Sequence, residues 1–494
     1  MTVLFLTLQL MYILSLQLSR DFVRFLRKLP AVNSIIRLVL AGEVKGAMKL
    51  LANENGDKKA DSDIGVIEIP EKSVSAEMIM SKLKYMYSTE KSRESGKGFA
   101  ITYTSTSTMK ELSESLGVAY ELYSESTGSG NVSHEKLVAD AWKIFMHTNA
   151  INPTAYHSLR RFETEVLSMC AWMLNGDAQV AGTLTSGGTE SVLMAVKTYR
   201  DRARKLCPHI TTPNMIAPTT IHPAFEKAAH YFGVEVIHIG LTDDYRVDVA
   251  AVAKAINSNT ILLIGSAPQY CHGVVDPIEA LSDLALSRGL PLHVDACFGG
   301  FMMPWLEKLG CKIPLWDFRV PGVTSISADI HKYGYCPRGA SVVLYRNAEL
   351  RAHQFFAYPS WPGGLFGSPA MAGSRPGGMI AAAWTAMVAM GQEGYMNIAR
   401  DVLEVTQKIV KVVDETKGIR LVTRPDMTAL AIMSDDPKVS ILALADVMEG
   451  KGWQMERQQC PDSLHVSVCI IRLLFCCFRK TLLAFLLSGT FDCV

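Results

Sequence analysis

The sequence predicts an α/β domain with a mainly parallel sheet, flanked by smaller segments, and two observations support this. Between about 150 and 345, short β-rich runs alternate with helical stretches, as in a parallel sheet covered by helices. The expected strands are Val234–Ile239, Thr260–Ile264, Pro291–Val294, Val323–Ile326 and Ser341–Tyr345, and the expected helices are Glu163–Leu174, Val192–Lys205 and Pro277–Arg288. Motifs with candidate chemistry also fall at the carboxyl ends of such strands, where open α/β sheets bind their ligands.

Length, charge and cysteine usage exclude several classes of protein. A chain of 494 residues is too long for one small core. Its 49 basic and 48 acidic residues leave a net charge of +1, which argues against a nucleic-acid binder. None of the 11 cysteines forms a C-x-x-C pair, so we expect no zinc ribbon and no other metal site, and the scattered thiols indicate a reducing compartment such as the cytosol.

The N-terminus carries a candidate membrane segment. Residues 1–19 contain no charge, and basic residues follow at once at Arg20, Arg24, Arg27 and Lys28. An apolar run of this length can just span a bilayer as a helix, and the positive flank would keep the rest of the chain cytoplasmic. A signal peptide and a buried or interfacial helix are the alternatives.

We divide the chain into five parts. Residues 1–19 are the predicted membrane anchor, and 20–150 hold a juxtamembrane helix, a linker and a Ser/Thr/Gly-rich insertion. Residues 151–375 form the large, ligand-binding domain, and 376–468 form a small C-terminal α/β domain. Residues 469–494 are an atypical apolar tail, and its arginines and lysine disfavour a second spanning helix.

The first motif is the segment TSGGTES at 185–191, directly ahead of an expected helix. The two glycines, Gly187 and Gly188, let the backbone approach an anion, and free N–H groups at a helix start can donate to it. The hydroxyls of Ser186 and Thr189 can add hydrogen bonds. A plain helix cap with Glu190 in the first turn is the alternative.

The second motif is HVDACFGG at 293–300, in which an apolar strand ends on Asp295. A buried carboxylate needs a charged or donating partner. A protonated pyridinium nitrogen is such a partner, because the carboxylate keeps it protonated and preserves the ring as an electron sink. A metal ion and a plain N-cap are the alternatives.

The third motif is SISADIHKYG at 325–334, in which Lys332 follows a strand and a histidine. Desolvation and nearby positive charge lower the pKa of a lysine and make its amine a nucleophile for a carbonyl. His331 could contact a phosphate or move protons. A surface charge is the alternative reading for a single lysine.

The order of these motifs is more informative than any one of them. A phosphate turn, then a ring-stacking residue, then a strand-end aspartate and then a lysine is the layout of fold-type I enzymes that use pyridoxal 5′-phosphate (PLP). His222 lies between the first two motifs and could stack on the cofactor ring, or could simply begin a helix. We therefore predict a PLP site in which Lys332 forms the Schiff base.

The sequence resembles the sphingosine-1-phosphate lyase family, within the wider group of PLP-dependent decarboxylase-like enzymes. The resemblance runs from about Asp21 to Ser467 and is most specific in TSGGTES, HVDACFGGF and SISADIHKYGYCPRG, with further matches in GSRPGG at 373–378 and KGW at 451–453. It implies a fold-type I, PLP-dependent transferase-like fold with a seven-stranded sheet. It also implies a homodimer with shared active sites, and we expect the endoplasmic reticulum membrane with the catalytic domain facing the cytosol.

The resemblance also implies residue roles. Lys332 would carry the cofactor, Asp295 would bind its ring nitrogen and His222 would stack on its ring. Its phosphate would be held by Gly188, Thr189 and His331, and by Ser368 from the partner subunit. The expected substrate residues are Tyr103, Asn149, Asn152 and Arg338. The implied reaction is retro-aldol cleavage of a sphingoid base 1-phosphate to phosphoethanolamine and a long-chain aldehyde.

The chain departs from the family pattern in three places. Asn152 stands where the family commonly has histidine, and Arg338 stands where it has lysine; both still donate hydrogen bonds, but Asn152 carries no charge and Arg338 has a planar fork. The tail from Cys469 replaces a family helix. The alternatives are an amino-acid decarboxylase of the same fold and a non-catalytic relative that binds lipid.

Overall fold

The computed structural model describes residues 67–88, 134–151, 155–450 and 455–468. The predicted anchor, the Ser/Thr/Gly-rich insertion, the tail, Tyr103 and Asn152 lie outside these ranges, so the predictions made for them stay predictions. Among the described helices, none is both long enough and apolar enough to cross a membrane.

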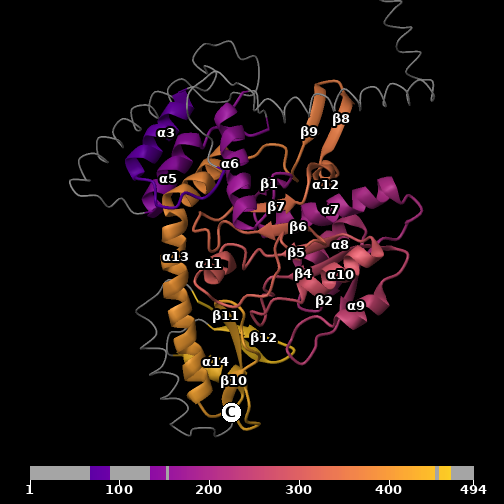
Figure 1. Cartoon of the computed structure of the whole chain (residues 1–494), viewed down its shortest axis with the longest axis vertical. Helices are drawn as coiled ribbons and strands as arrows, with labels where there is room; N and C mark the ends of the chain where they lie inside the picture. Colours follow the sequence, from indigo (N-terminus) through magenta and orange to yellow (C-terminus); the bar gives the residue numbers. More distant parts are fainter. Residues whose placement is uncertain (1–66, 89–133, 152–154, 451–454, 469–494) are drawn as a thin grey trace, which may run out of the picture. The chain divides into compact units, whose positions relative to one another are not determined.

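A seven-stranded sheet forms the centre of the large domain (Figure 1). Its strands in spatial order are β1 (Ala181–Thr185), β7 (Ser341–Tyr345), β6 (Val323–Ala328), β5 (Leu292–Asp295), β4 (Thr260–Ser266), β2 (Asn214–Pro218) and β3 (Glu235–Ile239). The strands from β6 to β3 are parallel, and β7 runs antiparallel to both of its neighbours. This sheet confirms the predicted fold class.

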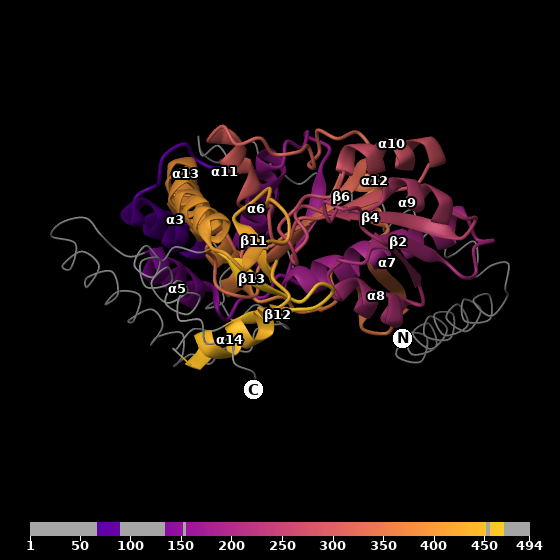
Figure 2. The ribbon, with the colours of Figure 1, turned by 90° about the horizontal axis from the view of Figure 1, so that it is seen from below.

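Helices cover both faces of the sheet. Figure 2 shows α7 (Gly188–Leu206) and α8 (Ala224–Phe232) on one face, and α9 (Val249–Ala255) and α10 (Ile278–Arg288) on the other. A strand covered on both sides reads as a continuous apolar run, and every residue of β4 is buried. Helix α7 begins at Gly188, four residues before the predicted start, so the glycine turn leads directly into the helix.

The remaining helices of the described ranges are α3 (Ala76–Ser88), α5 (His134–Phe145), α6 (His157–Met173), α11 (Met303–Lys308), α12 (Ala348–Ala352), α13 (Gly377–Glu415) and α14 (Ile441–Gly450). Of these, α6 and α12 pack against β1 and β7 of the sheet. The longest, α13, runs from α5 to the C-terminal sheet (Figure 1). It is broken at Gly391, where φ is +61° and an added Cβ would lie 2.8 Å from the backbone of Lys72 and Ser73. Only glycine fits this close approach.

Two further sheets complete the described chain. The C-terminal sheet is antiparallel, with the order β10 (Ile419–Leu421), β11 (Ala429–Ser434), β13 (Ser463–Ser467) and β12 (Glu456–Gln458). The strands β8 (Phe356–Trp361) and β9 (Gly364–Ser368) form a separate two-stranded hairpin, and Gly364, the first residue after its turn, has a φ of +107°. The predicted domain boundaries at 150, 375 and 468 stay predictions.

Strand β5 contains a buried histidine that makes stability depend on pH. His293 is fully buried, and its Nδ1 and Nε2 lie 2.8 and 3.2 Å from the hydroxyls of Ser325 and Ser327. Burial lowers the pKa of His293 from 6.5 to about 4. Its stabilising contribution is therefore present above pH 6.5 and is lost as the pH falls through 4.

We expect His293→Asn to reduce the pH dependence of the free energy of unfolding. Between pH 7 and pH 5 the wild type should lose about 2 kcal/mol more than the variant, because only its unfolded state takes up a proton at His293. Asp276, whose pKa burial raises to about 6, acts in the opposite direction but is present in both proteins and cancels. Urea unfolding at the two pH values measures the difference, and equal losses would contradict the assignment.

Candidate active site

The three sequence motifs meet at one edge of the seven-stranded sheet. Strands β1, β5 and β6 run in the same direction, because β7 is antiparallel to both β1 and β6. Their carboxyl ends therefore lie together. The glycine turn follows β1, Asp295 is the last residue of β5, and Lys332 lies four residues beyond the end of β6. The motifs identified in the sequence thus form one site.

Asp295 is held with one carboxylate oxygen occupied. Its side chain is 8% exposed, and its Oδ1 accepts hydrogen bonds from the Cys297 N–H at 3.0 Å and the Ser327 hydroxyl at 3.1 Å. Within the described residues Oδ2 accepts no hydrogen bond. The carboxylate is therefore fixed in position with a free oxygen for a cationic donor, as the pyridinium prediction requires.

Lys332 is paired with a carboxylate that the sequence analysis left without a role. Its Nζ lies 3.0 Å from Asp329 Oδ2 and 5.6 Å from the centre of the Phe298 ring. Burial alone lowers the pKa of Lys332, but Asp329, Cys297 and Asp295 outweigh it, so the pKa lies above its ordinary value. The predicted lowering of this pKa is wrong, because the charge nearest the amine is negative rather than positive.

The same carboxylate packs against the glycine turn. Asp329 is 3% exposed, and a Cβ added at Gly188 would lie 2.8 Å from its Oδ1 and 3.0 Å from Cys297 Sγ. Gly187, with a φ of +150°, also has a backbone conformation that favours glycine. At the start of α7 the Ser186 N–H donates to Glu190 Oε2 at 2.7 Å. The turn is therefore capped by Glu190 at the start of α7, where free N–H groups can also bind an anion.

His331 connects this turn to Lys332. Its Nε2 lies 3.5 Å from Asp329 Oδ2, and a Cβ at Gly187 would contact its ring at 3.6 Å. Burial, followed by the opposing influences of Asp329 and Lys332, leaves the pKa of His331 below its ordinary value. Its Nδ1 and the Asp329 Oδ1 are buried without a hydrogen-bond partner. Buried polar atoms of this kind usually have a partner, and here both lie beside the glycine turn.

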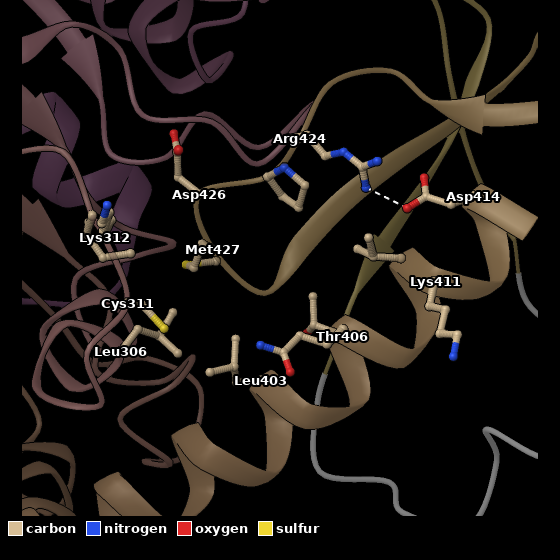
Figure 3. Close-up of a pocket in the computed structure, with 14 residues that line it drawn as sticks. Leu306, Cys311, Lys312, Leu403, Thr406, Lys411, Asp414, Arg424, Asp426 and Met427 are labelled. Carbon is tan, nitrogen blue, oxygen red and sulfur yellow. Dashed lines mark hydrogen bonds and ion pairs between the residues drawn. The ribbon is translucent and has the colours of Figure 1, made fainter.

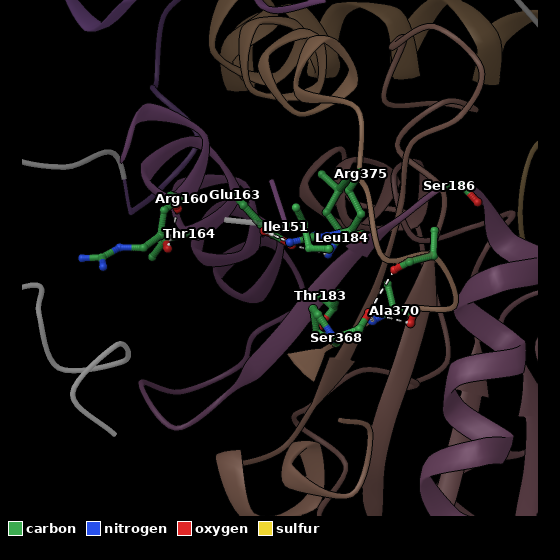
Figure 4. Close-up of polar contacts among 12 residues, drawn as sticks. Ile151, Arg160, Glu163, Thr164, Thr183, Leu184, Ser186, Ser368, Ala370 and Arg375 are labelled. Carbon is green, nitrogen blue, oxygen red and sulfur yellow. Dashed lines mark hydrogen bonds and ion pairs between the residues drawn. The ribbon is translucent and has the colours of Figure 1, made fainter. Parts of the chain in front are cut away.

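The Ser368 hydroxyl bonds to backbone carbonyls that lie close to it in the chain. Its hydroxyl donates to the carbonyls of Ala370 at 3.0 Å and Ala372 at 2.9 Å, and the side chain is 5% exposed. Figure 4 shows the contact with Ala370. The structure thus gives this hydroxyl a turn-forming role within one chain, and its predicted contact with a phosphate across a dimer stays a prediction.

Two predicted substrate residues occupy different environments. Asn149 donates to the Ser374 hydroxyl at 2.9 Å, and its Oδ1 accepts the N–H groups of Ile151 and Arg375 at 3.0 and 3.1 Å. Both ends of this amide therefore hold the segment before α13. Arg338 is exposed and lies close enough to lower the pKa of His331, so it remains available to an anionic ligand at this edge.

His222 lies in the loop after β2, at the same edge of the sheet. Its side chain is exposed, and its Nδ1 accepts the N–H of Ala224 at 3.1 Å. This bond caps the first turn of α8 and also fixes the ring. His222 thus lies just before the start of α8, close to the helix-start alternative that the sequence left open, and the ring-stacking role stays a prediction.

A pocket of about 410 Å³ lies elsewhere, between α13 and the loop that joins β10 to β11 (Figure 3). It is lined by apolar side chains such as Leu306, Leu403 and Met427, with Lys312 and Lys411 also among its residues. None of the predicted site residues lines it. The candidate chemistry is therefore assigned to the strand ends and not to this pocket.

Comparisons with known proteins address the family. The model for the pyridoxal-dependent decarboxylase conserved domain matches residues 127–433. Sphingosine-1-phosphate lyase 1 of Mus musculus is 36% identical over 92% of this chain and 74% of its own length. The chain belongs to the sphingosine-1-phosphate lyase family. This confirms the resemblance found in the sequence, and the pyridoxal dependence of the wider family confirms the predicted cofactor.

Other relatives extend the match. Sphingosine-1-phosphate lyase of Dictyostelium discoideum is 44% identical over 69% of this chain, and the chain spans 63% of that protein's length. The solved sphingosine-1-phosphate lyase of Burkholderia pseudomallei has a TM-score of 0.70 at 37% identity, covering 79% of this chain and 92% of that one. Lactobacillus brevis glutamate decarboxylase, with a TM-score of 0.64 at 20% identity, shows the shared fold alone.

The residues of the site fit PLP. Lys332 Nζ, 30% exposed in its side chain, would hold the cofactor's aldehyde carbon, and the free oxygen of Asp295 would hold its ring nitrogen. The glycine turn leads into α7, and Ser186 and Thr189 in it are exposed, so Gly188 and Thr189 would hold the phosphate, as expected for an anion at a helix start. The buried, unpartnered Nδ1 of His331 lies beside that turn.

Sequence reasoning missed three contributors to this site. Asp329 and Ser327 lay inside the quoted motif without a role, although an aspartate three residues before a lysine is a recognisable signal for an ion pair. Phe298 lay inside the second motif, and its ring lies under the Lys332 amine. No pattern in the sequence indicates that contact, because it joins two separate strand ends.

Proposed function

We propose that this chain is a PLP-dependent carbon–carbon lyase that cleaves a sphingoid base 1-phosphate to phosphoethanolamine and a long-chain aldehyde. The observation that carries the proposal is the placement of Lys332, Asp329 and Asp295 at adjoining strand ends. Support for the substrate comes from relatives named sphingosine-1-phosphate lyase at 44% and 36% identity.

The reaction breaks one bond and moves one proton. The hydroxyl on C3 of the substrate loses its proton, the C2–C3 bond breaks so that C3 leaves as the aldehyde, and the electron pair that remains on C2 takes up a proton to give phosphoethanolamine. When bound, PLP supplies an electron sink for that pair. The ring accepts electrons best when its pyridine nitrogen is protonated. The negative charge of Asp295, which is fixed by Ser327 and Cys297, would keep that nitrogen protonated.

The residues around Lys332 hold a proton and limit access of water. Nζ and the Asp329 carboxylate, 3.0 Å apart, form an acid–base pair that can give or accept a proton at the reacting carbon or hydroxyl. The Phe298 ring covers one side of the amine. Low polarity on that side strengthens the attraction between Nζ and the carboxylate.

A two-substrate assay tests the proposal. The purified chain, supplied with PLP, is incubated separately with a sphingoid base 1-phosphate and with an aromatic amino acid. Release of a long-chain aldehyde and phosphoethanolamine is expected from the first, and no carbon dioxide from the second. Carbon dioxide without aldehyde would favour the alternative, a decarboxylase, which is supported by the 33% identity to a probable L-tyrosine/L-aspartate decarboxylase of Methanothermobacter thermautotrophicus.

We also infer that the chain is anchored in the endoplasmic reticulum membrane, with its catalytic domain facing the cytosol, and that it acts as a homodimer. The uncharged run at 1–19 and the basic residues after it support the anchor. The family resemblance supports the dimer and the compartment. Light scattering of the detergent-solubilised protein measures the subunit number, and a chain released from membranes by alkaline carbonate would contradict the anchor.

A further inference from the structure

The C-terminal sheet contacts the edge of the large sheet that carries Lys332. The contact is made through the 267–276 loop, which follows β4. The Asp426 N–H donates to the Gly273 carbonyl at 3.0 Å, and Asp426 Oδ2 accepts the Val275 N–H at 2.8 Å. Gly273 has a φ of +75°, and an added Cβ would collide with the Ala429 carbonyl at 2.0 Å. This end of the loop is therefore clamped to β11 and the turn before it.

A second contact is made by two rings. Tyr270 of the loop stacks on His465 of β13, with ring centres 4.0 Å apart and an interplanar angle of 24°. Tyr270 also meets the Phe298 ring at 5.8 Å, and Phe298 meets Tyr333 at 5.8 Å. We call the rings of Tyr270, Phe298, Tyr333 and His465 the aromatic wall.

The aromatic wall lies beside the amine of Lys332. The Nζ is 5.6 Å from the centre of Phe298, which is the central ring of the wall. Tyr333 follows Lys332 directly in the chain, and its hydroxyl donates to the Val468 carbonyl at 3.1 Å. The C-terminal segment thus contacts the surroundings of Lys332 at two places, through His465 of β13 and through Val468 just beyond it.

The two stacked rings differ in how they are held. His465 is 5% exposed, and its Nε2 lies 2.6 Å from the Ser467 hydroxyl, which fixes the ring. Tyr270 is 43% exposed, and its hydroxyl makes no hydrogen bond within the described part of the chain. The His465 ring therefore supports the Tyr270 ring, whose position depends on the stacking contact.

We propose that His465 is a positioning residue of the active site: from the C-terminal sheet it holds the Tyr270 ring against Phe298, beside Lys332. Burial lowers the pKa of His465 to about 4, so the support is a neutral ring at pH 7. Stacking rather than charge makes the contact. The kinetic consequence rests on the proposed lyase function, whereas the effect on the loop does not.

Three variants of the full chain, loaded with PLP, test the role. His465→Ala removes the ring, and His465→Phe retains it without the imidazole nitrogens. Val466→Ala, on the neighbouring position of β13 that faces the other side of the strand, is the matched control for general weakening of that strand. Hydrogen exchange of peptides covering 267–276 is the first readout, and kcat and KM for the sphingoid base phosphate are the second.

We expect His465→Ala to raise amide exchange in the 267–276 loop at least about tenfold, with His465→Phe and Val466→Ala within about twofold of wild type. We also expect kcat to fall about tenfold in His465→Ala, with a smaller change in KM and with recovery in His465→Phe, because a displaced wall misplaces the reacting groups. Should His465→Ala not fold, Tyr270→Leu removes the same stack from the exposed side and should lower kcat similarly.

Two outcomes would overturn the proposal. One is loop exchange that rises no more in His465→Ala than in Val466→Ala. The other is failure of His465→Phe to restore the loop. A wild type that shows no lyase activity but gives the expected exchange pattern would instead reject the proposed function and leave the positioning role supported.

Discussion

Lys332→Ala is expected to abolish turnover of the sphingoid base phosphate, with a loss of about three orders of magnitude or more. The substitution removes the amine that would hold the cofactor and also leaves Asp329 without its partner at 3.0 Å. The visible absorption band of the cofactor–lysine bond should disappear from the purified protein. Absorbance spectra and aldehyde release, measured on the same preparation, check the two effects together.

Lys308→Ala is a matched control for this loss. Lys308 also lies over aromatic rings, with its Nζ 4.7 Å from Trp172 and 5.0 Å from Trp305, but it belongs to α11 and to no part of the site. Its replacement should leave the absorption band and turnover within about twofold of wild type. A visible band that persists in Lys332→Ala would refute the assignment of Lys332.

Glu163→Gln is expected to cause the largest loss of folding stability. Glu163 on α6 pairs with Arg375 through two bonds, at 2.5 and 2.9 Å, and its Oε1 also accepts the Leu184 N–H at 3.1 Å (Figure 4). Both side chains are largely buried, at 14% and 12% exposed. Burial opposes the charge of Glu163, but Arg375 outweighs it and the pKa of Glu163 lies below its ordinary value.

Removing one partner leaves a buried charge, which costs about 3–5 kcal/mol. The Arg375 guanidinium would be left uncompensated, since its Nε already lacks a hydrogen-bond partner. Chemical denaturation should show this loss for Glu163→Gln and a clearly smaller one for the double variant Glu163→Gln/Arg375→Met. Glu404→Gln, which breaks the exposed pair with Lys408 at 2.5 Å, should cost under about 1 kcal/mol. Equal losses for the exposed and buried variants would contradict this account.

The strands are predicted more accurately where their own residues favour β-structure. The predicted strand Ser341–Tyr345 coincides with β7, and Val234–Ile239 differs from β3 by one residue. Strands β1 and β2 were not predicted. Their sequences, AGTLT and NMIAP, contain Gly, Asn and Pro, which are poor strand formers. Packing between helices on both faces stabilises them, and such packing cannot be read from a short window of sequence.

The site could be predicted in its order but not in its electrostatics. Lys332, Asp295 and the glycine turn do meet at one edge because parallel strands end together. The predicted direction of the Lys332 pKa shift was wrong, since the shift depends on a 3.0 Å contact with Asp329. The hydrogen bonds of Asn149 with Ser374 and Arg375 join positions more than 200 apart in the chain, and no local pattern indicates them.

The hydroxyls around His293 have a consequence for Asp295. The Ser327 hydroxyl gives its proton to Asp295, so it must accept from His293 Nε2, and His293 Nδ1 must then accept from the Ser325 hydroxyl. Ser325 in turn accepts from the Tyr199 hydroxyl. All of these hydrogen bonds are donated in the same direction, and the last is donated to the Asp295 carboxylate. This order requires the His293 tautomer that is protonated on Nε2, and it polarises each bond toward Asp295. A substitution of Tyr199 on α7 would therefore change the electrostatic environment of Asp295, although the two side chains share no contact.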